Sequence, residues 1–134
     1  MNASIASRPR TIWVVNDEDC VLQAEAMILR QGFPHVTLRL FGEGVTAWEA
    51  LQHDRPDLLI TDDAMPAIRG QEIAERLHER GDKFPVMVTS PFEPTQEWVN
   101  ALAAQGMCIE WLALPMDLGE FLDRVAALLG ETRG

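Results

Sequence analysis

The sequence predicts an α/β domain in which helices cover both faces of a parallel five-stranded sheet. Short apolar runs, each about as long as one strand, alternate along the chain with segments that place apolar residues three or four positions apart. Most of these runs are apolar at consecutive positions, as in strands that are buried on both faces. Strands that alternate with helices in this way form parallel sheets with right-handed crossovers.

Each expected strand ends at a turn or at polar residues. The first runs into the acidic sequence Asn16-Asp17-Glu18-Asp19, and the third into Asp62. The second alternates apolar with polar residues, which is typical of a strand near the edge of a sheet. In chain order, the five expected strands span residues 12–15, 36–40, 58–62, 84–89 and 108–112.

The five expected helices each carry an apolar stripe that can pack on the sheet. Asp19 is expected to cap the first helix, whose inward stripe is predicted to be Val21, Ala24 and Ile28. In the last helix, Asp117 is the expected cap, and Leu118 is expected to face inward with five further apolar residues. The expected helices span about 20–31, 46–53, 71–80, 95–106 and 118–129.

One domain is expected to fill the chain. The 134 residues, of which 47% are hydrophobic, suffice for one substantial core and are too few for two ordinary domains. We expect a flexible N-terminal segment at residues 1–10, the domain itself at residues 11–130, and a C-terminal tail at residues 131–134.

The composition argues against nucleic acid and membranes as direct partners. The formal net charge is −10, whereas binding to phosphate backbones or anionic lipid requires clustered Lys and Arg. The two cysteines lack the paired spacing of a metal site or of a disulfide framework. No apolar run approaches the roughly 20 residues that span a bilayer, so a cytoplasmic protein is expected.

Polar side chains close three of the expected strands. Asp17 follows the first strand, Asp62 closes the third, and Thr89 closes the fourth. Ligands of parallel open sheets bind outside the carboxyl ends of the strands. We therefore expect these three side chains to form one polar site.

These segments resemble the receiver domain of two-component response regulators. The resemblance covers about residues 11–129, and its most specific sequences are Val14-Val15-Asn16-Asp17-Glu18, Asp62-Asp63-Ala64-Met65-Pro66 with Gly70, and Val88-Thr89-Ser90. It implies a flavodoxin-like three-layer sandwich with five helices and the strand order 2-1-3-4-5. It also implies a cis bond between Leu114 and Pro115.

By this resemblance, Asp62 accepts a phosphoryl group from a sensor histidine kinase or a phosphotransfer protein in a phosphorelay. Asp62 would also hold Mg²⁺ together with Asn16, Asp17 and the backbone carbonyl of Ala64, since this ion prefers oxygen ligands. The positive charge of the ion is needed because the carboxylate and the phosphoryl group are both anionic and repel each other.

The resemblance assigns two further roles. Thr89 would hydrogen-bond a phosphoryl oxygen, and Trp111 lies where an aromatic switch residue is usual. Phosphorylation would then bias a surface formed by the fourth helix, the fifth strand and the fifth helix, which a downstream effector protein would bind. The same helices could join two copies in a homodimer.

Two positions depart from the family pattern. Asn16 stands where an acid is usual, so weakened Mg²⁺ affinity is expected. Leu114 stands where the family carries a lysine that pairs with the phosphoryl group. Lys83, the one lysine of the chain, is expected at the opposite end of the sheet, roughly 16 Å from Asp62 at about 3.3 Å per residue. Arg69 is the loop arginine that could reach over the site instead.

Two functions therefore remain open. Asp17, Asp62 and Thr89 favour a working phosphoacceptor, toward which we lean. Leu114 and Asn16 favour a pseudo-receiver that binds proteins without being phosphorylated. Neither function makes the protein an enzyme, because the group that reacts is its own side chain. Asp63 is expected to point away from the site, since successive strand residues face opposite sides.

Overall fold

The computed structural model describes residues 9–131. In this part of the chain, five strands alternate with five helices, as the sequence predicts. Most boundaries differ from the predicted ones by one or two residues. In chain order the elements are β1 (Thr11–Val15), α2 (Asp19–Gly32), β2 (Thr37–Phe41), α3 (Gly44–Leu51), β3 (Leu58–Asp62), α4 (Gly70–Arg80), β4 (Val86–Ser90), α5 (Glu93–Ala104), β5 (Ile109–Ala113) and α6 (Leu118–Leu129).

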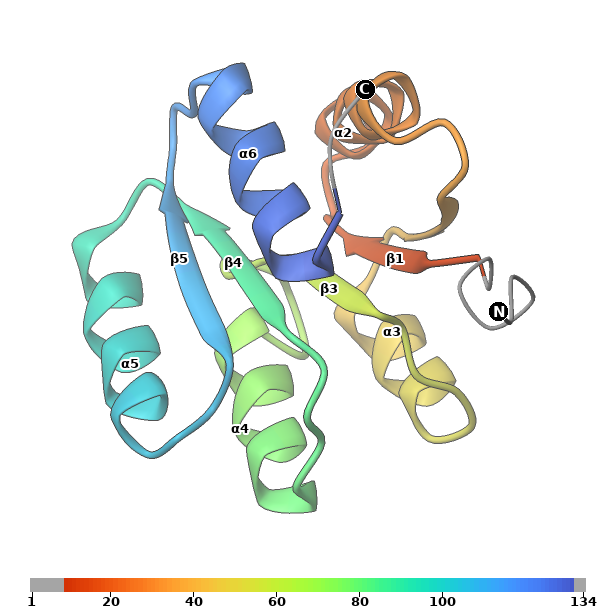
Figure 1. Cartoon of the computed structure of the whole chain (residues 1–134). Helices are drawn as coiled ribbons and strands as arrows, with labels where there is room; N and C mark the ends of the chain where they lie inside the picture. Colours follow the sequence, from red (N-terminus) through yellow and green to blue (C-terminus); the bar gives the residue numbers. More distant parts are fainter. Residues whose placement is uncertain (1–8, 132–134) are drawn as a thin grey trace.

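The five strands form one parallel sheet in the order β2-β1-β3-β4-β5. This order confirms the predicted fold class. The strands all run in one direction, so their carboxyl ends lie along a single edge (Figure 1). The residues that follow β1, β3 and β4 are thereby brought together.

Helices cover the sheet in two layers, with α2 and α6 on one face and α3, α4 and α5 on the other (Figure 1). Successive strand residues contribute to opposite layers. In β1, Trp13 and Val15 pack toward α3, α4 and α5, whereas Ile12 and Val14 pack toward α2 and α6. The sheet is therefore buried on both faces, which explains its nearly continuous apolar strands.

The first helix is rotated relative to the prediction. The buried residues of α2 include Leu22, Glu25, Ala26 and Leu29, and the expected inward residue Val21 is 36% exposed. The true inward stripe contains an acid, so the apolar pattern is more regular on the neighbouring face. The prediction was therefore wrong for Val21 and Ala24, whereas Ile28 is partly buried and packs against the core.

The two predicted helix caps have different outcomes. Asp117 caps α6, and its Oδ1 accepts the Glu120 N–H at 2.9 Å. The cap position of α2 is Glu18, so Asp19 was wrongly predicted as the cap and lies instead in the first turn. Leu118 was also wrongly placed inward: it is the first residue of α6 and is 53% exposed.

The Leu114–Pro115 bond is cis, as the resemblance implies. Both cysteines, Cys20 and Cys108, are free and exposed. Most of the two expected terminal segments lies outside the described residues. Within residues 9–131, no helix has the length and apolar character needed to cross a membrane.

Candidate functional site

A pocket of about 350 Å³ opens at the carboxyl ends of the central strands. It combines acidic and amide groups with an apolar wall, and neither lysine nor arginine lines it. The structure thus brings the predicted acceptor, the predicted carbonyl ligand and the position of the replaced lysine into one cavity. The lining residues are Asn16, Glu18, Val21, Asp62, Ala64, Pro91, Phe92 and Leu114.

Asp62 lies at the end of β3 and is half-buried. Its pKa is raised from 3.8 to about 6, chiefly because burial disfavours the charged carboxylate. The negative charges of Asp17, Asp63 and Glu18 raise the pKa further. The pocket therefore concentrates negative charge around Asp62 without a basic side chain in its lining to balance it.

A second buried acid, Glu25 of α2, interacts with two residues that line this pocket, Asn16 and Asp62. Glu25 is 3% exposed, and burial raises its pKa from 4.5 to about 7, with a further contribution from the charge of Asp62. A side-chain hydrogen bond with Asn16 acts in the opposite direction and lowers the pKa of Glu25. The sequence held a signal for this residue, because an acid three positions after Leu22 and four before Leu29 lies on the same helix face as both.

Asn16 is therefore engaged on two sides. Its Oδ1 accepts the Glu18 N–H at 2.9 Å, and its side chain also hydrogen-bonds with Glu25. The Asn16 side chain is 4% exposed. An aspartate at this position would confront the carboxylate of Glu25, so the amide matches its buried acidic neighbour.

The available donors fit a magnesium ion. Asp17 is exposed beside the pocket, Asp62 contributes a carboxylate, and Ala64 contributes a carbonyl oxygen. Within residues 9–131, no three Asp, Glu, His or Cys side chains converge as an all-protein metal centre would require. Mg²⁺ commonly retains several waters and needs only one or two carboxylates, so this set is sufficient for it.

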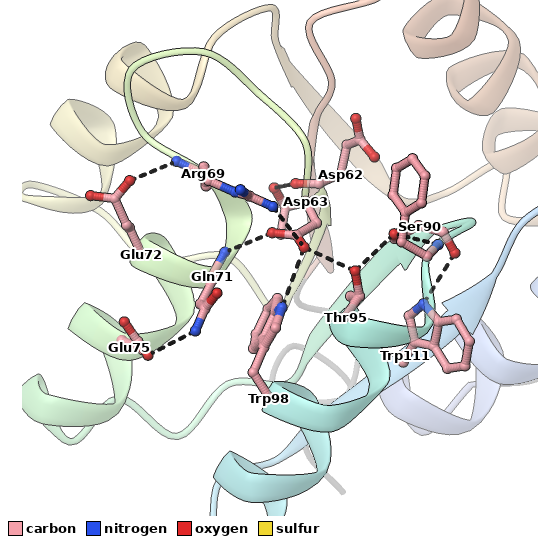
Figure 2. A network of polar contacts seen from close by, with 12 residues as sticks. Asp62, Asp63, Arg69, Gln71, Glu72, Glu75, Ser90, Thr95, Trp98 and Trp111 are labelled. Atoms are coloured by element: carbon pink, nitrogen blue, oxygen red, sulfur yellow. Dashed lines mark hydrogen bonds and ion pairs between the residues drawn. The ribbon is translucent and has the colours of Figure 1, made fainter.

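Asp63 points away from Asp62, as strand alternation predicts (Figure 2). It is 3% exposed, and its Oδ1 accepts the backbone N–H of Gln71 at 3.2 Å. Its Oδ2 accepts the Thr95 hydroxyl at 2.9 Å and the Trp98 indole N–H at 3.3 Å. One acid of the pair thus faces the pocket, while the other joins α4 and α5 to the end of β3.

Arg69 does not lie over the acceptor. Its guanidinium is 3.5 Å from the Oδ2 of Asp63, the acid that points away from Asp62 (Figure 2), and Arg69 does not line the pocket. Lys83 is exposed and lines a separate pocket with Gly81 and Asp82, before β4 begins. The structure therefore brings neither residue into the place of the missing lysine.

Thr89 and Ser90 end β4 with two buried hydroxyl groups. Thr89 is the register partner of Asp62, and its carbonyl accepts the Asp63 N–H at 3.2 Å. The Ser90 carbonyl accepts the Trp111 indole N–H at 3.1 Å, which ties β5 to the end of β4. The sequence predicted roles for Thr89 and Trp111, whereas Ser90 was named only as part of the motif Val88-Thr89-Ser90.

Comparison with known proteins identifies the family. A family model described as the response regulator receiver domain matches residues 12–125. The chain belongs to this family. As the receiver domain of a response regulator, it has its place in two-component signalling. The resemblance inferred from the sequence is thus confirmed.

The receiver domain is similar to part of longer response regulators. The response regulators MprA of Mycobacterium ulcerans and Mycobacterium leprae are 34% and 33% identical to it over 122 residues, or 91% of this chain. The matches cover 51% and 52% of those proteins. The chain therefore spans about half the length of the curated relatives it matches.

Solved structures share the fold of this receiver domain. The signal receiver domain of an HD domain-containing protein from Pseudomonas fluorescens has a TM-score of 0.77 and 20% identity, covering 92% of this chain and 96% of that one. The chemotaxis response regulator CheY4 of Vibrio cholerae has a TM-score of 0.75 and 19% identity, covering 91% and 100%.

Proposed function

We propose that this receiver domain accepts a phosphoryl group on Asp62 and thereby switches a protein-interaction surface. The observation that supports this proposal is the position of Asp62, whose half-buried carboxylate lines a pocket at the sheet edge. In the proposed transfer, a carboxylate oxygen of Asp62 forms a bond to phosphorus as the bond from phosphorus to a kinase histidine breaks. The imidazole leaves with its electron pair and takes up a proton.

Asp17, Asp62 and the carbonyl of Ala64 are the proposed ligands of Mg²⁺, with Asn16 as a further oxygen donor. When bound, the ion supplies positive charge that reduces the repulsion between the carboxylates and the incoming phosphoryl group. The side chain of Asn16 already accepts a hydrogen bond from the Glu18 N–H and forms another with Glu25. This engagement supports the proposal of a weak magnesium site.

Leu114 supplies no charge to the phosphoryl group, so we expect slow transfer. The side chain lines the pocket, where the family lysine would pair with the anion. The Thr89 hydroxyl is the proposed hydrogen-bond donor to the modified Asp62. Trp111 donates a hydrogen bond to the Ser90 carbonyl at the end of β4. It would transmit the conformational change that follows phosphorylation to the surface of α5, β5 and α6.

The proposed partners are a sensor histidine kinase or phosphotransfer protein and a downstream effector. A second candidate function is a pseudo-receiver that binds its partner unmodified. It is favoured by Leu114 and by the engagement of Asn16 with Glu25. Both functions use the same fold and differ in whether Asp62 reacts.

Intact-mass measurement after incubation with acetyl phosphate and Mg²⁺ separates the two functions. The phosphoacceptor proposal expects a single phosphoryl adduct on the wild type and none on Asp62→Ala. Circular dichroism shows whether both proteins are folded. A folded wild type without an adduct would contradict phosphorylation and favour the pseudo-receiver.

A further inference from the structure

Three buried side chains form a continuous hydrogen-bonded chain behind the acceptor strand. The Ser90 Oγ lies 2.8 Å from the Thr95 Oγ1, which lies 2.9 Å from the Asp63 Oδ2 (Figure 2). The exposed fractions are 0% for Ser90, 1% for Thr95 and 3% for Asp63. We call these three residues the Asp63 chain.

The donor and the acceptor of each hydrogen bond in the Asp63 chain can be assigned. Asp63 accepts N–H groups from Gln71 and Trp98, so its oxygens act as acceptors and the Thr95 hydroxyl donates to it. A hydroxyl carries one hydrogen, so Thr95 has none left for Ser90. The Ser90 hydroxyl therefore donates to Thr95.

The oxygen of Ser90 is occupied as well. Its Oγ accepts the Phe92 N–H at 3.0 Å, and the Phe92 carbonyl accepts the Thr95 N–H at 3.1 Å. Phe92 is the cap position of α5. The Asp63 chain thus connects the ends of β3 and β4 to the first turn of α5 and holds the Ser90 hydroxyl on the side away from Asp62.

This arrangement opposes movement of the β4 end toward Asp62. A phosphoryl group brings three strong acceptor oxygens, which attract the hydroxyl groups at that end. If the end of β4 shifts, the hydrogen bond between Ser90 and Thr95 must break. Breaking it leaves a buried donor without its acceptor, which is unfavourable.

We propose that Thr95 is a positioning residue that holds Ser90 and the first turn of α5 in the unmodified arrangement, so that modification of Asp62 must release this contact. This inference rests on the proposed function for its signalling role. The hydrogen-bonded restraint itself belongs to the unmodified protein. The restraint and the signalling role can therefore be tested separately.

The first test measures binding of beryllofluoride, a phosphoryl mimic, by fluorine NMR in the presence of Mg²⁺. Thr95→Val removes the hydroxyl and keeps the branched shape. Because the restraint acts only in the unmodified state, the variant is expected to bind beryllofluoride about fivefold more tightly than the wild type, at the lower end of typical coupling energies. If both proteins bind beryllofluoride, equal or weaker binding by the variant would overturn the inference.

Thr11→Val is the matched control. The Thr11 hydroxyl also contacts an aspartate, since its Oγ1 lies 3.3 Å from the Oδ2 of Asp57, but it lies at the start of β1 at the opposite end of the sheet. Wild-type binding is expected for this variant and for Thr95→Ser, which keeps the hydroxyl. In a Ser90→Ala background, Thr95→Val should give no further gain; a full gain would contradict action through Ser90.

The second test is amide hydrogen exchange of the unmodified protein. Loss of the Thr95 hydroxyl loosens Ser90, so the Phe92 amide is expected to exchange about tenfold faster in Thr95→Val than in the wild type or Thr11→Val, as for a local opening easier by about 1.4 kcal/mol. Unchanged exchange at Phe92 would overturn the inference. A third outcome is faster exchange of the Phe92 amide in Thr95→Val although neither the wild type nor the variant binds beryllofluoride. That result would support the restraint and contradict the proposed function.

Discussion

Glu25 couples a buried ionisable group to the electrostatics of the site. It places an ionisable group within electrostatic reach of Asp62, on a helix face that is otherwise apolar. Its partner Asn16 is neutral, so the acid common at that family position is absent while another acid stands behind it. In this receiver domain a buried acid whose charged form is disfavoured lies beside the neutral Asn16.

Replacing Glu25 should change the pH dependence of stability. Because its pKa rises from 4.5 to about 7 on folding, the folded state retains a proton that the unfolded state releases between these values. The free energy of unfolding should therefore fall as pH rises from about 4.5 to about 7, by about 3 kcal/mol at 1.36 kcal/mol per unit. Glu25→Gln should remove this contribution, as measured by urea unfolding at about pH 5 and about pH 8 in metal-free buffer.

Glu79→Gln, on the exposed side of α4, is the control and should keep the wild-type pH dependence. The raised pKa of Asp62 acts in the same direction and remains in all three proteins. The comparison between variants therefore isolates Glu25. An equal loss of stability in Glu25→Gln and in the wild type would contradict the prediction.

The two hydroxyl groups at the end of β4 should respond differently to substitution. Thr89→Ala is expected to weaken beryllofluoride binding about tenfold, since a hydrogen bond to a charged group contributes about 1.5–3 kcal/mol. Thr89→Ser should bind nearly as the wild type does. Fluorine NMR titration measures both. Weaker binding in Ser90→Ala with no change in Thr89→Ala would assign the phosphoryl contact to Ser90 instead.

At the scale of the elements, the close approach of α4 to β3 depends on a glycine. A Cβ at Gly70 would lie 2.5 Å from the Asp62 carbonyl oxygen and 3.0 Å from the Asp63 Cα. Real Cβ atoms do not approach backbone atoms so closely, so either α4 or the end of β3 would have to shift. The glycine thus holds the acceptor strand and the start of α4 in contact.

Gly70→Ala is expected to lower the free energy of unfolding by about 1–3 kcal/mol, the usual cost of overpacking. Gly42→Ala is the matched control, because a Cβ at Gly42 meets no atom within 4 Å. It should change stability by no more than about 0.5 kcal/mol. Urea unfolding measures both variants, and equal effects would refute a role for this close contact.

The elements also show which parts of the fold a sequence can predict. Strands were located because each apolar run stops at an abrupt polar or turn sequence. The inward face of α2 was missed because Glu25 interrupts the true stripe. Arg69 could not be placed from the sequence, since its position depends on Asp63, whose carboxylate is buried between α4 and α5. Helices and strands produce local sequence patterns, whereas contacts between them produce few.

For the whole molecule, the alternation of strands and helices was enough to predict one parallel sheet, and the family resemblance supplied its strand order. The acids of the site were predictable because they end strands that meet at one edge. The Asp63 chain was not, because it joins the residue that follows β3 to residues of β4 and α5, up to 32 positions away. Such a chain exists only once the layers have packed.

The net charge of −10 makes magnesium relevant to the stability of the whole domain. An ion that binds only the folded state stabilises it, by about 1.4 kcal/mol at ten times the dissociation constant. Mg²⁺ is therefore expected to raise the free energy of unfolding relative to sodium chloride of equal ionic strength. Chelation should reverse the effect, and urea unfolding measures it.

Asp17→Asn should abolish most of this magnesium-dependent stabilisation. Asp19→Asn is the matched control, because Asp19 is also exposed near the pocket, in the first turn of α2, and is not a proposed ligand. An equal response in both variants would show that Mg²⁺ acts by general charge screening. That result would contradict a magnesium site at Asp17.

The hydrogen bonds of Trp98 and Trp111 have an optical consequence. One indole donates to Asp63 and the other to the Ser90 carbonyl, so two natural fluorophores contact opposite ends of the Asp63 chain. The other two tryptophans, Trp13 and Trp48, lie in β1 and α3 beside arginine side chains. The tryptophan emission spectrum of this receiver domain should therefore report, without an added label, whether the hydrogen bonds of the Asp63 chain are intact.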